Sequence, residues 1–158
     1  MDNNFLNKDQ IINLLPHREP MLLIDELINI VPYKSAVGIV NVKKNSFYFQ
    51  GHFPGQPVMP GVIIVEAFGQ AAAALTAHSL NPKEVENKLV YLMSVNKARF
   101  RNPIIPECKL FLEIEAIRSR GRVWRYQGIA KVNETKMADA EWAATIMDRN
   151  QQWFTKLV

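Results

Sequence analysis

The chain of 158 residues contains little cysteine and little histidine. Its single cysteine, Cys108, excludes an intramolecular disulfide and a cysteine-based zinc cluster. The three histidines, His17, His52 and His78, have no H-x-x-x-H or similar spacing, so neither a metal nor another cofactor is expected. One unpaired thiol is typical of a reducing compartment, and the first residues lack the pattern of a signal peptide. These absences predict a cytoplasmic protein.

The chain also lacks a strong excess of charge of either sign. Its 19 basic and 15 acidic residues give a net charge of +4, and no stretch resembles a nucleic-acid-binding motif. This modest positive charge favours an acidic protein partner over a nucleic acid. Repeats, linkers and low-complexity segments are absent from the sequence, so a single domain of residues 1–158 is predicted.

No apolar run is long enough to predict a membrane span. The longest, residues 61–77, falls short of the roughly 20 apolar residues that a spanning helix needs. It also contains Glu66, and a carboxylate near the bilayer centre would cost about 2.5–3.5 kcal/mol. A helix that is apolar on nearly every face of a water-soluble domain must be surrounded by other elements. Residues 61–77 are therefore predicted to form a buried core helix.

The remaining pattern is mainly that of antiparallel strands. Apolar side chains alternate with polar ones in the last third of the chain, with the period of two that is typical of a half-buried strand. A short helix is predicted at residues 8–15, and strands are predicted at residues 21–31, 35–43, 89–101, 110–117, 123–132 and 138–146. The simplest arrangement is an α+β domain in which a curved antiparallel sheet of about six strands wraps around one long helix.

The most informative segment is G-H-F-P-G-Q-P-V-M-P-G, residues 51–61. Prolines at every third position, Pro54, Pro57 and Pro60, fix the backbone and make the loop a rigid mount for His52. The predicted helix begins at Gly61, where free backbone N–H groups can hold a developing oxyanion. Glu66 lies one to two turns further along the helix, about 7.5 Å along its axis. The segment therefore offers a base, an acid and an oxyanion site.

Glu66 is expected to be buried among apolar neighbours, which would raise its pKa and keep it protonated near neutral pH. A protonated carboxyl beside a histidine that can accept a proton forms an acid/base pair. Such a pair suits removal of a proton next to a carbonyl group and protonation of a departing hydroxyl. Taken singly, either residue is more simply explained as a hydrogen-bonded structural residue, and only their combination favours catalysis.

These motifs, together with L-P-H-R-E-P-M-L-L-I-D at residues 15–25, closely resemble the 3-hydroxyacyl-acyl-carrier-protein dehydratases of bacterial type II fatty-acid synthesis, in their Z-type branch. The resemblance covers almost the whole chain and implies the hot-dog fold. It implies that His52 abstracts the α-proton, that Glu66 protonates or orients the leaving hydroxyl, and that the N–H of Gly61 polarises the thioester carbonyl. It also implies a homodimer in which His52 and Glu66 of one site come from different subunits, assembled as a hexamer.

The resemblance leaves several residues without a firm role. His17 and Arg18 belong to the first motif, and a structural role for them is favoured over direct catalysis. His78 is expected to be a favourable charge at the helix end. Five apolar residues could line an acyl tunnel, although core packing is the default for such residues: Phe53, Phe68, Met93, Phe100 and Ile104. Two alternating basic groups could dock an acidic acyl carrier protein or lie on a solvated surface: Lys97, Arg99 and Arg101, and Arg118, Arg120 and Arg122.

Two other functions remain open at this stage. Hot-dog proteins also hydrolyse acyl thioesters, and that reaction needs a water aimed at the carbonyl carbon rather than a base aimed at the α-carbon. A non-catalytic acyl-thioester-binding module is the third possibility. Glutamate at position 66 favours the dehydratase branch over the related dehydratase/isomerase branch, which has aspartate there. Chain-length preference, tunnel shape, the exact oligomer and any residual isomerase activity do not follow from the sequence.

Overall fold

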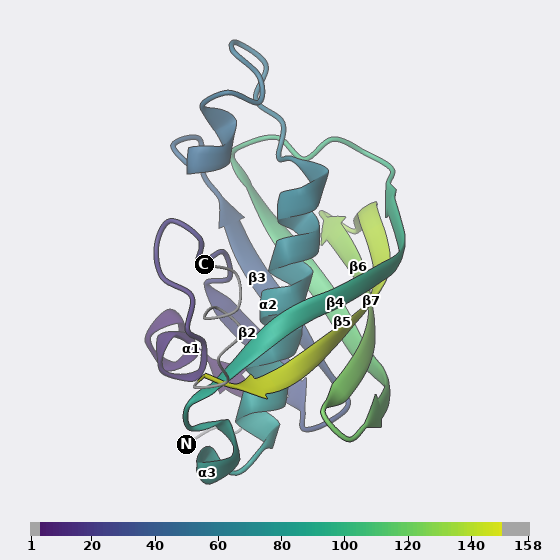
Figure 1. Ribbon diagram of the computed structural model, residues 1–158. Coiled ribbons are helices and arrows are strands. Elements are labelled where there is room, and N and C mark those ends of the chain that lie inside the picture. Colours follow the sequence, from purple (N-terminus) through teal and green to yellow (C-terminus); the bar gives the residue numbers. More distant parts are fainter. Residues whose placement is uncertain (1–3, 150–158) are drawn as a thin grey trace, which may run out of the picture.

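A helix of nineteen residues, α2 (Gly61–Ser79), forms the axis of the molecule. The computed structural model describes residues 4–149, and in it a single antiparallel sheet curves around α2 (Figure 1). The prediction of one long core helix wrapped by a sheet is thus confirmed. The predicted single domain of residues 1–158 includes residues 1–3 and 150–158, which lie outside the described residues.

The sheet contains seven strands, where about six were expected. Their bounds are β1 (Phe5–Leu6), β2 (Glu26–Val31), β3 (Ser35–Val42), β4 (Lys88–Phe100), β5 (Cys108–Arg120), β6 (Val123–Val132) and β7 (Thr135–Asp148). Their order is β1-β2-β3-β5-β6-β7-β4, and every neighbouring pair is antiparallel. The strand missing from the prediction is β1, whose two residues are too few to give a periodic pattern.

Three short elements connect this framework. The helix α1 (Lys8–Leu14) begins at a capping box in which the side chains of Asn7 and Gln10 each bind the other's backbone N–H. It confirms the short helix predicted at residues 8–15. The 3-10 turn η1 (Phe47–Phe49) precedes the loop of residues 50–60 that leads into α2, and the single-turn helix α3 (Pro82–Val85) follows α2. Neither turn was predicted from the sequence.

The strand predicted at residues 21–31 is wrong in its first half, because β2 begins only at Glu26. The backbone N–H groups of Met21 and Leu22 bond to the carbonyl of Arg18 in a turn. The carbonyl of Met21 and the N–H of Leu23 bond to the side chain of Gln70 on α2. Since these backbone groups find partners outside the sheet, the apolar residues 21–23 do not need strand pairing.

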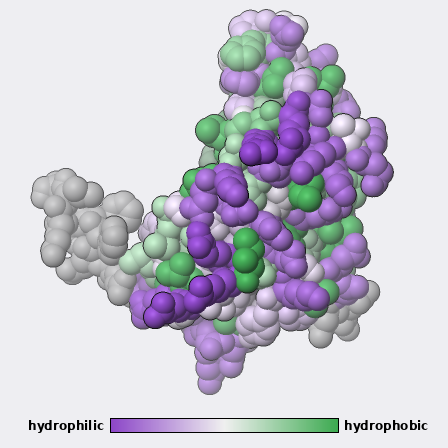
Figure 2. All heavy atoms as spheres, turned by 90° about the vertical axis from the view of Figure 1, so that its right-hand side faces the viewer, coloured by the Kyte–Doolittle hydropathy of each residue, from purple (hydrophilic) through white to green (hydrophobic). Residues whose placement is uncertain are grey.

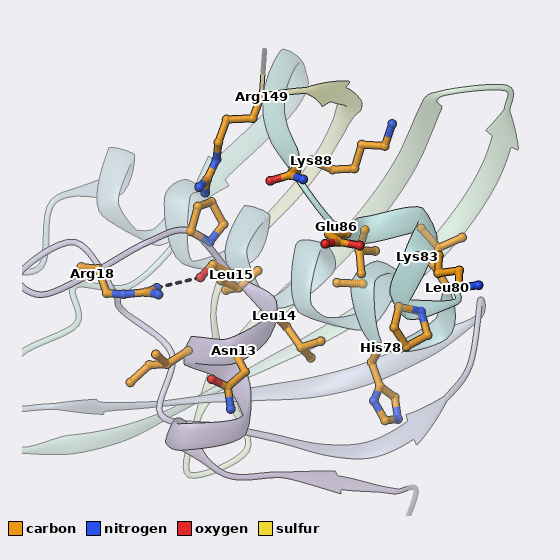
Figure 3. Close-up of a pocket in the computed structure, with 16 residues that line it drawn as sticks. Asn13, Leu14, Leu15, Arg18, His78, Leu80, Lys83, Glu86, Lys88 and Arg149 are labelled. Carbon is orange, nitrogen blue, oxygen red and sulfur yellow. Dashed lines mark hydrogen bonds between the residues drawn. The ribbon is translucent and has the colours of Figure 1, made fainter. Parts of the chain in front are cut away.

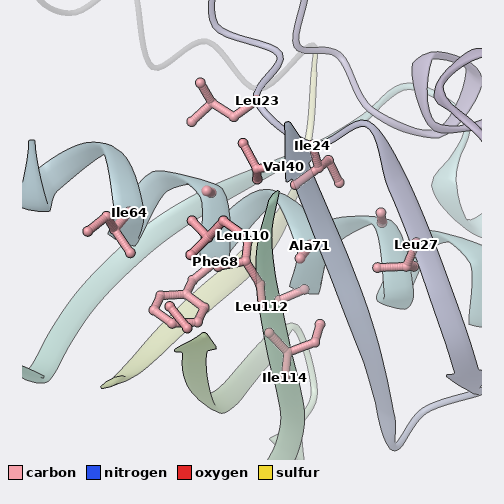
Figure 4. Close-up of a cluster of buried hydrophobic side chains, with 14 of the residues drawn as sticks. Leu23, Ile24, Leu27, Val40, Ile64, Phe68, Ala71, Leu110, Leu112 and Ile114 are labelled. Atoms are coloured by element: carbon pink, nitrogen blue, oxygen red, sulfur yellow. The ribbon is translucent and has the colours of Figure 1, made fainter. Parts of the chain in front are cut away.

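The core lies between α2 and the concave face of the sheet (Figure 4). The alternating residues of β5, β6 and β7 point inward as predicted, and Leu112, Tyr126 and Trp142 are among the largest fully buried side chains. Phe68 of α2 stacks on Trp142, with ring centroids 5.2 Å apart. A Cβ on Gly128 would lie 2.6 Å from the Phe68 ring, so glycine allows the helix to approach β6 this closely.

By length and hydropathy alone, α2 could cross a membrane, and it is the one helix among residues 4–149 with this property. Its most apolar window has a mean hydropathy of 1.3, and 56% of that window is buried inside the molecule. The surrounding sheet accounts for this apolar composition, because a helix covered on most sides must be apolar on most sides.

Candidate active site

His52 is held by the loop that precedes α2. This loop projects beyond the N-terminal end of α2 at the top of Figure 1 and closes on itself through backbone hydrogen bonds. Val58 N donates to the carbonyl of His52 at 2.9 Å, and Phe53 and Gln56 exchange bonds of 3.0 and 2.9 Å. Met59 N also donates to the carbonyl of Ile104 at 2.8 Å, which ties the loop to the segment after β4. The loop is a fixed mount, as its prolines predict.

The imidazole of His52 has a defined tautomer. Its Nδ1 lies 2.7 Å from the carbonyl oxygen of Val58, and the ring stacks on Phe53 with centroids 4.0 Å apart. Because a carbonyl oxygen can only accept a hydrogen bond, Nδ1 must carry the proton. In the neutral ring, Nε2 then holds the free lone pair and can accept a proton from a substrate.

A cavity of about 280 Å³ opens beside His52. Gly61 and Ile64 of α2 line it on one side, and Phe100 and Ile104 line it on another. Phe100 lies directly over Gly61, since a Cβ at Gly61 would be only 2.8 Å from Cζ of the Phe100 ring. Gly61 is thus the residue that lets this ring approach the first turn of the helix. Two tunnel candidates, Phe100 and Ile104, therefore lie in the same cavity as His52 and Gly61.

The side chain of Glu66 lies in a separate hydrogen-bond network. Nε2 of Gln70 donates to Oε1 of Glu66 at 2.9 Å, and also to the carbonyl of Met21 at 2.7 Å. Oε1 of Gln70 accepts from the N–H of Leu23 at 2.8 Å. Gln70 is only 1% exposed, so these bonds satisfy a buried amide and fix the position of its neighbour Glu66. The network connects α2 to residues 21–23.

The expectation that Glu66 has a raised pKa is wrong. Burial raises the pKa of this carboxyl, but the hydrogen bonds from His17 and Gln70, with the electrostatic attraction of His17, outweigh burial and lower it. Nε2 of His17 lies 3.3 Å from Oε1 of Glu66, and the side chain of Glu66 is 33% exposed to solvent. Burial is therefore only partial, and two donors favour the ionised form.

His17 is the site residue that sequence reasoning assigned to a structural role. It comes from the segment after α1, far from Glu66 in sequence, and only the folded chain brings the two together. Its position in the first motif was the available signal, but the motif alone does not name a partner. Arg18, its neighbour, donates from Nη1 to the carbonyls of Leu15 and His17 at 2.8 and 2.7 Å. Arg18 therefore stabilises the backbone that carries His17.

The other predicted residues are dispersed. Phe53 stacks on His52, Phe68 is fully buried in the core, and Met93 is exposed on β4. Lys97 and Arg99 are exposed on β4. Arg101 directly follows this strand, is also exposed, lines the His52 cavity and pairs with Asp139 at 2.7 Å. Arg118, Arg120 and Arg122 are exposed at the far end of the β5–β6 hairpin. His52, Gly61, Phe100, Ile104 and Arg101 share one cavity, and Glu66 is not in its lining.

A larger cavity, of about 720 Å³, lies between α1, α3 and the C-terminal end of α2 (Figure 3). Its lining includes His78 in the last turn of α2, but its carboxylate, Glu86, is exposed to solvent. A solvated carboxylate beside a helix end offers no desolvated acid. The smaller cavity at His52, with a defined tautomer and a free helix N-terminus, is the better candidate for chemistry.

Comparison with known proteins shows which family the chain belongs to. The model of the FabA-like domain matches residues 15–141. The FabZ 3-hydroxyacyl-[acyl-carrier-protein] dehydratase of Rhodospirillum rubrum is 50% identical over 143 residues, which cover 90% of this chain and 89% of that protein. Its namesake from Myxococcus xanthus is 47% identical over 141 residues, which cover 89% of this chain and 92% of that protein.

Two solved structures share the fold at low sequence identity. The dehydratase heterocomplex ApeI:P from Xenorhabdus doucetiae matches with a TM-score of 0.77 at 15% identity, over 88% of this chain and 91% of that chain. Cj0977, a virulence protein from Campylobacter jejuni, matches with a TM-score of 0.65 at 16% identity, over 89% of this chain and 90% of that chain. The resemblance inferred from the two sequence motifs is confirmed: the chain belongs to the FabA-like family, among the FabZ-type 3-hydroxyacyl-[acyl-carrier-protein] dehydratases.

Proposed function

We propose that this protein removes water from a (3R)-3-hydroxyacyl-[acyl-carrier-protein] and releases the trans-2-enoyl thioester, as a step of fatty-acid synthesis. Nε2 of His52 takes the proton from the α-carbon, and the electrons of that C–H bond form the new double bond. The carboxylate of Glu66 orients the departing hydroxyl, which takes the proton from His52 and leaves as water. The backbone N–H of Gly61 polarises the thioester carbonyl, so the negative charge that develops on its oxygen is stabilised.

The observation that carries this proposal is the common cavity of His52 and Gly61. The base and the oxyanion donor must face the same substrate, since they act on adjacent atoms, the α-carbon and the carbonyl. Pro60 provides no side-chain cap to α2, so the first N–H groups of the helix remain available for a ligand. The bond from Nδ1 of His52 to Val58 keeps Nε2 unprotonated in the neutral ring.

The site is completed by a second subunit. Within one chain Glu66 turns toward His17 and Gln70, and it does not line the His52 cavity. A homodimer that brings Glu66 of one subunit to His52 of the other would unite the acid and the base. The edge strand β4 supports such an interface, because it exposes Tyr91, Leu92, Met93 and Val95. Figure 2 shows the face of the molecule that lies on the right-hand side of Figure 1, and on this face apolar patches, coloured green, lie among polar side chains.

The partner that presents the substrate is an acidic acyl carrier protein. Arg101 directly follows β4 and lies at the His52 cavity, and Lys97 and Arg99 are exposed on β4 itself. Positive charge at the mouth of the site would attract and steer an acidic protein. We propose Lys97, Arg99 and Arg101 as the docking group nearest the site, a hexamer built from three dimers as the assembly, and the cytoplasm as the location.

Hydrolysis of the thioester is the competing reaction, and one assay separates the two. The purified protein is given a 3-hydroxyacyl carrier protein, and both the enoyl thioester and free thiol are measured over time. Dehydration predicts enoyl product without thiol release, and loss of that product in His52→Ala. Release of free thiol as the main product would instead identify a thioesterase. Tight binding without either product would identify a binding module.

A further inference from the structure

One oxygen of the Glu66 carboxyl is held from two sides. Nε2 of His17 lies 3.3 Å from Oε1, and Nε2 of Gln70 donates to the same atom at 2.9 Å. Both of these contacts fall on the same oxygen, Oε1. Because the side chain keeps 33% of its surface exposed, a substrate can still reach the carboxyl. The arrangement separates a held oxygen, Oε1, from a free oxygen, Oε2.

Both donors are anchored to the segment between α1 and β2. Gln70 is fixed by the carbonyl of Met21 and the N–H of Leu23, at 2.7 and 2.8 Å. The backbone of His17 is fixed by the guanidinium of Arg18, which donates to the carbonyl of His17 at 2.7 Å. The carboxyl of Glu66 thus takes its direction from this segment as well as from its own helix.

The imidazole of His17 can donate only toward Glu66. Its Nδ1 is buried and has no hydrogen-bond partner among residues 4–149. A buried N–H without an acceptor is destabilising, so the proton is better placed on Nε2, which faces Oε1. Among residues 4–149, the hydrogen-bond and ion-pair partners of the Glu66 carboxyl are His17 and Gln70, and of these only His17 is ionisable. Gln70 is neutral, and Arg18 is directed to the carbonyls of Leu15 and His17.

We propose that His17 is a positioning residue for Glu66: with Gln70 it clamps Oε1 and directs Oε2 toward the hydroxyl group of the substrate. This inference rests on the proposed function, in which Glu66 acts on that hydroxyl. In the elimination, Oε2 of the ionised carboxyl accepts a hydrogen bond from the substrate hydroxyl and orients it. The C–O bond breaks, and the departing oxygen takes the proton that His52 removed from the α-carbon and leaves as water. The two N–H donors hold the carboxylate charge on Oε1 throughout the step.

A titration of Glu66 tests the clamp without any turnover. Glutamate is labelled with ¹³C at its carboxyl carbon, and the Glu66 signal is assigned by its loss in Glu66→Gln. In His17→Ala one donor is gone while the burial of Glu66 remains, so its pKa should rise relative to the unmodified protein. His17→Gln can place an N–H near the position of Nε2 and should return the pKa toward its original value. His17→Leu provides the same comparison as alanine with more retained volume, should the alanine variant not fold.

The matched control is His78→Ala, which removes an imidazole from the last turn of the same helix, about 18 Å from Glu66 along its axis. It should leave the Glu66 titration unchanged. An unchanged titration in both His17→Ala and His17→Leu would overturn the clamp. So would a shift of the same size in His78→Ala, because it would reflect a general change in the helix.

Turnover supplies the second readout. His17→Ala should lower kcat about 10–100-fold with little change in KM, and should move the limb of the pH profile that depends on Glu66 to higher pH. His17→Gln should recover part of kcat. An unchanged kcat in His17→Ala would contradict the positioning role. A protein that shows the titration shift but never forms enoyl product would retain the clamp and refute the proposed function.

Discussion

The Nδ1 atom of His52 lies 2.7 Å from the carbonyl oxygen of Val58, across a loop that three backbone hydrogen bonds close. This bond does two things at once. It holds the ring against rotation, and it leaves the lone pair of the neutral ring on Nε2. The three prolines of the loop stiffen the backbone that carries both partners. The base is therefore prepared before any substrate arrives, which is the arrangement that efficient proton transfer requires.

Removing either member of the acid/base pair should abolish dehydration and spare the fold. His52→Ala removes the base, and Glu66→Gln removes the ionisable group while keeping its shape. Each change should lower kcat by at least about 10²–10⁴-fold, since general acid–base groups typically contribute that much. Circular dichroism and size-exclusion chromatography check that structure and assembly persist. His78→Ala is the control, and a loss of similar size in this variant would show that the rate is not specific to the pair.

The close contact between Gly61 and Phe100 predicts an effect on turnover. Gly61→Ala places a Cβ about 2.8 Å from the ring, so the ring must move within the cavity that it shares with His52. Phe100 is 52% exposed and can rotate, so the free energy of unfolding should change by less than about 1 kcal/mol while kcat/KM falls about tenfold or more. In a Phe100→Ala background, Gly61→Ala should have little further effect.

Gly69→Ala is the matched control for that prediction. It adds a Cβ to the same helix, at a position with no atom within 4 Å of the added carbon. Alanine is the better helix former, so the free energy of unfolding should rise by about 0.5–1 kcal/mol, with unchanged turnover of a short-chain substrate. Urea unfolding and initial rates measure both. An equal loss of activity in the two variants would refute the role of the Phe100 contact.

The buried hydroxyl of Tyr126 predicts a loss of stability at high pH. Burial raises the pKa of Tyr126 from 10.0 to about 12, although a hydrogen bond with Thr76 lowers it in part. Its contribution to stability is present below pH 10 and is lost as the pH rises from 10 to 12. The loss should be on the order of 2 kcal/mol.

Urea unfolding of the unmodified protein and Tyr126→Phe between pH 7 and pH 11 measures this effect. At neutral pH the variant should be less stable by about 1 kcal/mol, because it lacks the hydrogen bond to Thr76. Above pH 10 the difference should shrink, since phenylalanine cannot ionise. A difference that stays constant with pH would contradict the assignment.

Charge reversal tests the proposed docking group. Arg99→Glu combined with Arg101→Glu should raise KM about tenfold for the carrier-bound substrate, because it replaces attraction of an acidic partner with repulsion. The effect should weaken as salt is added. The same substrate on a small uncharged thiol should be used nearly as well as by the unmodified protein. The double reversal of Arg118 and Arg120 shows whether the hairpin end contributes instead, and unchanged KM in the first variant would refute docking on β4.

Most of the fold could be predicted because its signals are local. The alternating residues of β5, β6 and β7 and the apolar run of α2 each depend only on neighbours in sequence. The start of β2 could not be predicted in this way. The apolar residues 21–24 resemble a strand, but the side chain of Gln70 bonds to the carbonyl of Met21 and the N–H of Leu23, which a strand would pair. A contact across the fold decided the boundary.

The candidate site, too, could be predicted only where its signals are local. His52 and Gly61 lie in one continuous motif, and the structure places both in one cavity, as their rigid spacing suggested. The state of Glu66 could not be predicted, because local composition points to burial, while the decisive donor, His17, comes from another part of the chain. The composition of the neighbouring sequence predicts whether a residue is buried, but only the folded structure shows which residues hydrogen-bond to it and so shift its pKa.

The central claim is that His52 of one subunit acts with Glu66 of the other, and mixed dimers test it most directly. His52→Ala and Glu66→Gln subunits, each inactive alone, are unfolded together and refolded as a mixture. Half of the dimers then contain one subunit of each kind, and one of their two sites has both intact residues. The account predicts recovery of about one quarter of the activity of the unmodified protein under the same refolding. A mixture that stays as inactive as its two components would contradict it.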